Sequence, residues 1–245
     1  MKFTELFIYK PLFMFELLIA MHLFSFHLPK KKNYIIRYII SILSCLILSI
    51  LFPLFDNVSY SWWFSSLMFI VLYLIAFISL FFVYDVPWHK LFFISIASYT
   101  SQHLSHELYA LIARLFNLNN SSSLGFYGNN EISLDSSIQI IQIMSYLEIH
   151  LLVYIVIYFL FGKKIKNDEK SLMLISSLIL FTNIVLSSVI TYLDMNYNKI
   201  YFIIVGIYNI LSCLMVLYIQ FYIIDNKKLK GELQLTSQLL HQSEI

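Results

Sequence analysis

The sequence predicts an all-α protein, a polytopic membrane helix bundle with about seven transmembrane helices. Two observations indicate this class. Hydrophobic residues make up 60% of the 245 positions and charged residues only 12%, about half the charge of a soluble domain, and the mean hydropathy is +0.77. The charged residues also gather in short clusters between apolar runs of about 20 residues, the length that crosses a bilayer. We therefore expect the lipid bilayer to be a partner of this chain.

The apolar runs define the predicted helices in chain order. Each run is long enough to cross most or all of the bilayer core at about 1.5 Å per residue. Cys45 and Cys213 both fall inside such runs, so no structural disulfide is expected. The predicted spans are Leu6–Leu28, Tyr38–Phe55, Trp62–Val83, Leu91–Phe116, Ile138–Phe161, Leu172–Tyr192 and Ile200–Ile224.

The basic residues mark alternate connections between the runs and predict the orientation. Cytoplasmic loops of membrane proteins carry an excess of Lys and Arg. The N-terminus is therefore expected outside and the C-terminus in the cytoplasm, in a multi-pass protein of the cell membrane. The basic residues in question are Lys30, Lys31, Lys32, Arg37, Lys90, Lys163, Lys164, Lys166, Lys170, Lys227, Lys228 and Lys230.

The character of the chain changes after Ile224. Residues 1–224 form the predicted transmembrane sensor domain, and residues 225–245 form the start of a cytoplasmic signalling or coiled-coil helix. The final residues contain no Gly or Pro stop signal, so we expect the chain to belong to a longer protein.

The tail after Ile224 carries apolar positions spaced 4, 3 and 4 residues apart, which is the start of a heptad seam. A homodimer through this helix is therefore expected. A single amphipathic helix beside the membrane explains the same pattern, and Gly231 lowers the helix propensity of the tail. The spaced positions are Leu229, Leu233, Thr236 and Leu240.

Polar and ionisable residues concentrate near the middle of several predicted spans. Such residues are costly in a bilayer and usually face the bundle interior or a cavity. His103 and Glu107 are spaced i, i+4 and share one helix face, whereas Glu148 and His150 point about 160° apart and are not expected to serve one site. The candidate ligand or switch residues are Glu16, Gln102, His103, His106, Glu107, Glu148, His150, Asn183 and Asn209.

Three interpretations of these residues remain open. They form a structural network of hydrogen bonds between helices, a ligand pocket or switch, or a metal site that needs His103, His106 and Glu148 to converge. The zinc-protease spacing H-E-x-x-H fails, because Ala110 stands where the second His should be. No catalytic motif occurs, no cofactor is expected, and a net charge of +2 does not indicate a nucleic-acid partner.

Two stretches and the layout together resemble a known family. Ala97 to Leu104, on the fourth span, reads as a polar Gln-His stretch, and the tail from Asn226 to Leu240 follows the last span directly. With the count of spans, this is similar to the membrane sensor region of bacterial histidine kinases that carry a GHKL-type ATPase domain. That group includes peptide-pheromone receptors, and the similarity covers essentially the whole chain.

The resemblance implies a sensor of a two-component system. An extracellular signal such as a short peptide would act on the outer loops, including the long connection at 117–137, and pass through the last helix to a cytoplasmic output domain. His241 is not followed by the acceptor run of the family, so no catalytic residue is carried over. The alternative is a small proton-coupled transporter or permease, for which replacement of Glu107 or Glu148 by Gln would abolish flux.

Overall fold

The computed structural model describes residues 3–51, 62–115, 137–161, 177–178, 181–182 and 199–243. Within these residues the chain is helical and contains no strand beyond a single isolated bridge between Lys30 and Tyr84. The predicted all-α class is confirmed. The helices are α1 (Phe3–Ser25), α2 (Tyr34–Leu51), α3 (Trp62–Val83), α4 (Trp88–Leu115), α5 (Ser137–Phe161) and α7 (Lys199–Ser243).

The predicted runs coincide with these helices to within a few residues at most ends. The predicted run Leu172–Tyr192 lies largely outside the described residues, of which 177–178 and 181–182 are helical. The last helix has 45 residues and runs from Lys199 through Gly231 to Ser243. The predicted last span and the predicted tail helix are therefore one continuous helix. One glycine costs about 1 kcal/mol in a helix, and the structure absorbs that cost without a break.

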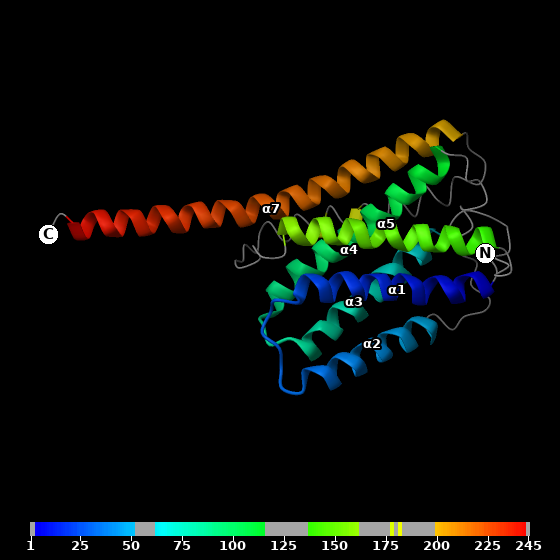
Figure 1. The fold of residues 1–245 in the computed structure, drawn as a ribbon, viewed down its shortest axis with the longest axis horizontal. Coiled ribbons are helices and arrows are strands. Elements are labelled where there is room, and N and C mark those ends of the chain that lie inside the picture. Colours follow the sequence, from blue (N-terminus) through cyan, green and yellow to red (C-terminus); the bar gives the residue numbers. More distant parts are fainter. Residues whose placement is uncertain are drawn as a thin grey trace.

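Helix α4 is the centre of the bundle. It packs against α1, α3, α5 and α7, while α2 packs on α1 and α3 at one side. Figure 1 shows α7 lying along the bundle with its N-terminal half and projecting past the bundle with its C-terminal half. The turn between α1 and α2 lies at the end of the bundle from which α7 projects, and the N-terminus lies at the other end.

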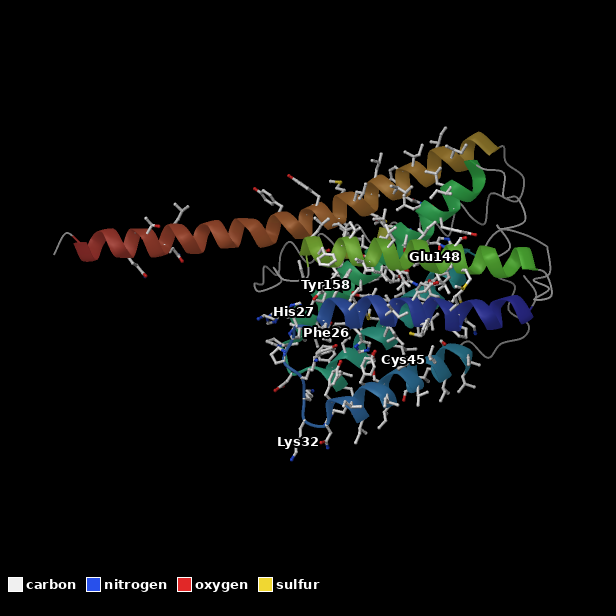
Figure 2. All side chains as sticks on the ribbon, in the orientation of Figure 1. Phe26, His27, Lys32, Cys45, Glu148 and Tyr158 are labelled. Atoms are coloured by element: carbon white, nitrogen blue, oxygen red, sulfur yellow. The ribbon has the colours of Figure 1, made fainter. Side chains whose placement is uncertain are left out.

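Helix α2 buries small side chains and exposes large apolar ones. Its buried residues are Ser41, Cys45 and Ser49, spaced four apart, and Figure 2 shows Cys45 on the side that faces the other helices. Small residues at this spacing let two helix backbones approach closely, as is common between membrane helices. The large aliphatic side chains of α2 are exposed instead, namely Ile35, Ile36, Ile39, Ile40, Leu43, Ile47, Leu48 and Leu51.

The basic turn after α1 closes the C-terminal end of α3. Lys31 Nζ donates a hydrogen bond to the carbonyl oxygen of Phe81 at 2.6 Å, and Arg37 Nη1 donates to that of Phe82 at 3.2 Å. The backbone N–H of Lys31 donates to the carbonyl of Val83 at 3.1 Å. The last carbonyls of a helix have no partner within it and carry partial negative charge. Lys31 and Arg37, two of the basic residues that predict the orientation, therefore also stabilise the C-terminal end of α3.

Membrane-crossing character is visible in one described helix by length and composition. Among the described residues, α2 is the helix that combines at least 18 residues with sufficient apolar content, with a mean hydropathy of 2.2. Shorter apolar stretches run over residues 67–83, 144–160 and 206–220.

Candidate functional site

The centre of the bundle holds a group of polar side chains that we name the Glu16 cluster, consisting of Glu16, Gln102, Tyr146 and His150. Helices α1, α4 and α5 each contribute to it, and Glu16 and His150 are only 2% and 1% exposed. Gln102 Nε2 donates to Glu16 Oε2 at 3.4 Å and to the carbonyl oxygen of Phe13 at 2.9 Å. The hydroxyl of Tyr146 donates to the same Oε2 atom at 3.2 Å. Three helices thus meet at one carboxyl oxygen.

The position of a proton in this cluster follows from the contacts of His150. Its Nδ1 atom lies 2.8 Å from the carbonyl oxygen of Tyr146. A carbonyl oxygen only accepts hydrogen bonds, so Nδ1 carries a hydrogen. The Nε2 atom lies 3.6 Å from Glu16 Oε2, which is an ion-pair distance when the imidazole is protonated. It makes no hydrogen bond among the described residues.

The Glu16 cluster has unused hydrogen-bonding capacity. Glu16 Oε1 and Gln102 Oε1 are buried and have no hydrogen-bond partner among the described residues, and the same holds for Asn209 Oδ1 on α7. A buried polar atom without a partner costs about 1–3 kcal/mol. The Tyr154 hydroxyl, which can donate, and His150 Nε2 are likewise buried without a partner, so the interior holds both unused acceptors and an unused donor.

A second group, the Glu107 cluster, joins α4 to α7 and consists of His103, Glu107 and Asn209. Asn209 Nδ2 donates to Glu107 Oε1 at 3.1 Å. His103 Nε2 lies 4.0 Å from the same oxygen, one turn earlier on α4. The helix spacing i, i+4 therefore places the pair on one face as predicted, and the facing helix supplies the partner. The cluster is a direct polar connection between the central helix and the helix that leaves the bundle.

The structure separates the predicted candidates into groups. Gln102, Glu16 and His150 meet in the Glu16 cluster, and His103, Glu107 and Asn209 meet in the Glu107 cluster. The ring of His106 lies 6.2 Å from that of Tyr146, edge to face, and so reaches the border of the Glu16 cluster. Asn183 lies outside the described residues, as does most of the connection at 117–137.

Glu148 stands apart from both clusters. It is exposed on α5, while His150 two residues later is buried, and Figure 2 labels Glu148 on this helix. The predicted divergence of the two side chains is therefore confirmed, and His150 is the α5 residue that faces the interior. His103, His106 and Glu148 do not converge, and within the described residues no three His, Cys, Asp or Glu side chains are grouped as metal ligands.

Some interior polar residues were not singled out by sequence. Tyr146 completes the Glu16 cluster, but it is one of 18 tyrosines and nothing local distinguishes it. Gln220 is buried on α7 and its Nε2 donates to the carbonyl oxygen of Phe93 on α4 at 3.4 Å. The sequence did contain a signal for Gln220, because it is an amide inside an apolar run. It also lies eleven residues, or about three helical turns, after Asn209 and therefore on the same face of the helix. Lys10 is also buried, on α1.

The hydroxyl groups of α4 form a structural set distinct from the clusters. They donate to carbonyl oxygens three or four residues earlier in their own helix, which satisfies them without a partner helix. The hydroxyl of Ser95 also lies 2.7 Å from that of Tyr73 on α3. The residues that bond back in this way are Ser95, Ser98, Thr100, Ser101 and Ser105.

His22 belongs to an aromatic group near the basic turn rather than to the central clusters. Its Nδ1 atom lies 3.3 Å from the hydroxyl of Tyr84. Its ring meets that of Tyr38 edge to face at 4.6 Å. This group ties α1 and α2 to the segment after α3 and has a clear packing role.

Comparison of the chain with protein-family models, with curated proteins and with solved structures found no match. Any functional assignment therefore depends on the geometry of the two clusters and of α7.

Proposed function

We propose that this chain is a multi-pass membrane protein that senses a signal and transmits it through α7 to an output domain in the cytoplasm. The observation that carries the proposal is the course of α7. Its first half is bonded to α4, through Asn209 to Glu107 and through Gln220 to the carbonyl oxygen of Phe93, and its second half continues as the same helix beyond the bundle.

The distribution of apolar side chains supports embedding in a bilayer. Large hydrophobic residues are exposed along α2, α5 and α7, among them Leu152, Phe159 and Leu211, while the interior holds Glu16, Gln102 and many hydroxyl groups. Soluble monomers rarely expose contiguous apolar patches above a few hundred Å². Helices α3 and α5 have 22 and 25 residues, enough to cross a hydrocarbon core about 30 Å thick. A lipid environment accounts for both the apolar exterior and the polar interior.

The predicted orientation agrees with the shape of the bundle. Figure 2 shows Lys32, in the basic turn after α1, at the end of the bundle from which α7 projects. The positive-inside rule assigns this end to the cytoplasm. The projecting half of α7 would then point toward a cytoplasmic output domain, and the opposite end would meet an extracellular signal such as a short peptide.

The two clusters supply an element with two states. Unused donor and acceptor atoms allow Glu16, Gln102 and His150 to pair in more than one way, and α4 connects this cluster to the Glu107 cluster. A signal that favours one pairing shifts the population toward it, which requires differential affinity for the two arrangements. Because Asn209 binds Glu107, a change on α4 alters the position of α7.

A distance measurement tests this coupling. Spin labels at Lys32 and Gln234, both exposed, report the position of the projecting helix relative to the bundle in lipid nanodiscs. Asn209→Leu and His103→Ala are expected to shift or broaden the distance distribution. The control Leu211→Val changes an exposed residue of the same helix and should leave it unchanged. Identical distributions for all variants would contradict transmission from the Glu107 cluster to the tail.

A proton-coupled transporter is the second candidate, favoured by the buried carboxyl of Glu16 3.6 Å from the imidazole of His150. Carriers commonly use buried carboxyl and imidazole groups as proton relays. Proton flux into liposomes distinguishes the two functions. A carrier loses flux when Glu16 or Glu107 becomes Gln, and Glu148→Gln on the exposed face serves as the control, whereas a receptor shows no flux in any form.

A further inference from the structure

Two turns form one surface at the end of the bundle from which α7 projects. The basic turn after α1 pairs with the turn between α3 and α4 through the bridge between Lys30 and Tyr84. The backbone N–H of Asp85 also donates to the carbonyl oxygen of Pro29 at 3.0 Å. Two segments that are about 50 residues apart in the sequence therefore lie side by side.

This surface carries a positive charge that its own residues do not neutralise. Residues 26–37 and 84–90 contain five basic side chains and one acidic one, Asp85, which gives a net charge of +4 with the histidines neutral. Helices α2 and α4 begin here, and neither has an acidic residue in its first turn. The N-terminal end of a helix adds partial positive charge. The excess charge therefore favours an anion from outside the chain.

The four basic residues of the turn after α1 divide into two pairs. Lys31 and Arg37 donate to carbonyl oxygens at the end of α3, so their charges are directed at the protein. Lys30 and Lys32 are exposed, and neither forms an ion pair with a carboxyl group of the described residues. Figure 2 shows Lys32 pointing away from the helices. Lys30 and Lys32 are therefore the residues of this turn that can bind an external anion.

The ammonium group of Lys30 is positioned by two aromatic rings. Its Nζ atom lies 4.5 Å from the ring centroid of Phe26 and 4.6 Å from that of Tyr34. Cation–π contacts hold an ammonium group without neutralising its charge. The group has three N–H donors, so it can contact the rings and an anion at the same time.

Exposed apolar side chains adjoin the charged residues. Trp88 begins α4 and is 58% exposed, and Phe26 is 61% exposed. Tryptophan gathers at membrane–water interfaces, where its ring meets both acyl chains and headgroups. The exposed aliphatic side chains of α2 begin at Ile35. In the proposed bilayer, Lys30 and Lys32 would therefore lie at the level of the lipid phosphate groups.

We propose that this surface binds the headgroups of anionic phospholipids, with Lys30 and Lys32 in contact with the phosphate and Trp88 beside the acyl chains. We name these three residues the headgroup site. A lipid fits because the charged and apolar parts of the surface adjoin, whereas a free anion would use only the charged part. The inference rests on the proposed membrane embedding. In the proposed orientation the site faces the cytoplasmic leaflet, which carries anionic lipids.

Tryptophan fluorescence reports which lipid touches the site. The chain has three tryptophans, and replacing Trp62 and Trp63 with Phe leaves Trp88 as the only reporter. The full chain is reconstituted in phosphatidylcholine vesicles that contain an increasing share of brominated phosphatidylglycerol or brominated phosphatidylcholine, whose bromine atoms quench tryptophan on contact. Comparison of the two curves gives the relative affinity for anionic lipid. We expect a several-fold preference for phosphatidylglycerol that decreases as salt screens the charges.

Neighbouring lysines supply matched variants. Lys30→Gln and Lys32→Gln should each lower the preference by up to about fivefold, and Lys30→Arg should keep it because the charge and the ring contacts remain. Lys31→Gln removes the same charge at the next position together with the bond to the Phe81 carbonyl. It should lower the thermal unfolding midpoint and leave most of the preference in place. Equal losses of preference in Lys30→Gln and Lys31→Gln would show an effect of net charge and overturn the site.

The quenching curves also separate the headgroup site from the membrane embedding. If neither brominated lipid quenches Trp88, this end of the bundle does not meet a bilayer, and both hypotheses fail. If both lipids quench it equally, the embedding stands and only the headgroup site fails. Inorganic phosphate, compared with sodium chloride at the same ionic strength, identifies the source of the anion. Loss of the preference with phosphate alone would mean that the site binds the free ion, which would also overturn the proposal.

Discussion

Helices α2 and α4 lie in the same bundle and are built in opposite ways. Helix α2 buries only a row of small residues at 41, 45 and 49 and exposes its large aliphatic side chains. Helix α4 buries most of its surface, including Gln102 and Glu107, and places hydroxyl groups at its centre. The apolar helix is at the periphery and the polar helix is in the middle.

The contrast fits the membrane embedding that we propose. In water, apolar side chains drive burial because removing their surface from water is favourable. In a bilayer no such force acts between helices, and packing of small residues together with polar contacts holds them together. Helix α4 has four neighbouring helices for its polar groups, and in the proposed bilayer the exposed leucines of α2 would contact lipid. Four substitutions test this contrast, beginning with the one expected to have the greatest effect.

Leu43→Asp tests what the outer face of α2 meets. Leu43 is exposed near the middle of the helix, and an acidic side chain at the centre of a bilayer costs about 3 kcal/mol. We expect a large loss of monodisperse protein by fluorescence-detected size-exclusion chromatography. Lys32→Asp, in the exposed turn before α2, should be tolerated. Normal behaviour of Leu43→Asp would mean that α2 faces water.

Two serines of α2 form a matched pair that tests its inner face. Ser41 is buried against α3 and Ser44 is exposed one turn later. Ser41→Leu inserts a large side chain where the backbones approach, which typically costs about 1–3 kcal/mol, so the thermal unfolding midpoint should fall. Ser44→Leu adds apolar surface on the outside and should leave the midpoint unchanged or raise it. Equal midpoints would show that α2 packs through a different face.

Tyr146→Phe tests the interior polar contacts around α4. The variant keeps the ring and removes the hydrogen bond from the hydroxyl to Glu16 Oε2. Interhelical hydrogen bonds contribute about 0.6 kcal/mol on average, so a small decrease in thermal stability is expected. Tyr208→Phe, at an exposed position of α7, is the control. A decrease of equal size in both variants would remove the Glu16 cluster as its cause.

Arg37→Met tests the junction between α2 and α3. It keeps the apolar stem and removes the donor to the Phe82 carbonyl. Cations near helix C-termini typically contribute about 0.3–1 kcal/mol, so the decrease in the thermal midpoint should be small and comparable to that of Tyr146→Phe. Lys32→Met removes one positive charge from the turn before α2 without removing that bond. If both variants behave alike, net charge rather than the helix end explains the change.

Much of the fold was predictable because helix formation follows local patterns. The apolar runs located α3 and α5 closely, and the spacing of His103 and Glu107 placed them on one face. The opposite directions of Glu148 and His150 followed from helical periodicity alone. A helix after Ile224 was also expected from the sequence. It joins the last span without a break as far as Ser243, because neither the change in polarity after Ile224 nor Gly231 interrupts backbone hydrogen bonding.

The composition of the clusters was less predictable. Sequence identified most of their polar members but treated them as one layer, whereas the structure divides them between α1–α4–α5 and α4–α7 contacts. The structure adds Tyr146 to the Glu16 cluster, because its hydroxyl binds Glu16. It excludes Glu148 from both clusters, because Glu148 is exposed. Each of these outcomes depends on how one helix is rotated relative to its neighbour, which single-helix patterns do not contain.

The sequence alone was sufficient for the helical class and for the face that His103 and Glu107 share, because both follow from the local period of about 3.6 residues per turn. Only the tertiary structure decided that α4 is central, that His150 Nε2 points at Glu16 and that Asn209 binds Glu107. The physical reason is that such contacts depend on helix crossing angles and rotations, which are set by packing over the whole bundle.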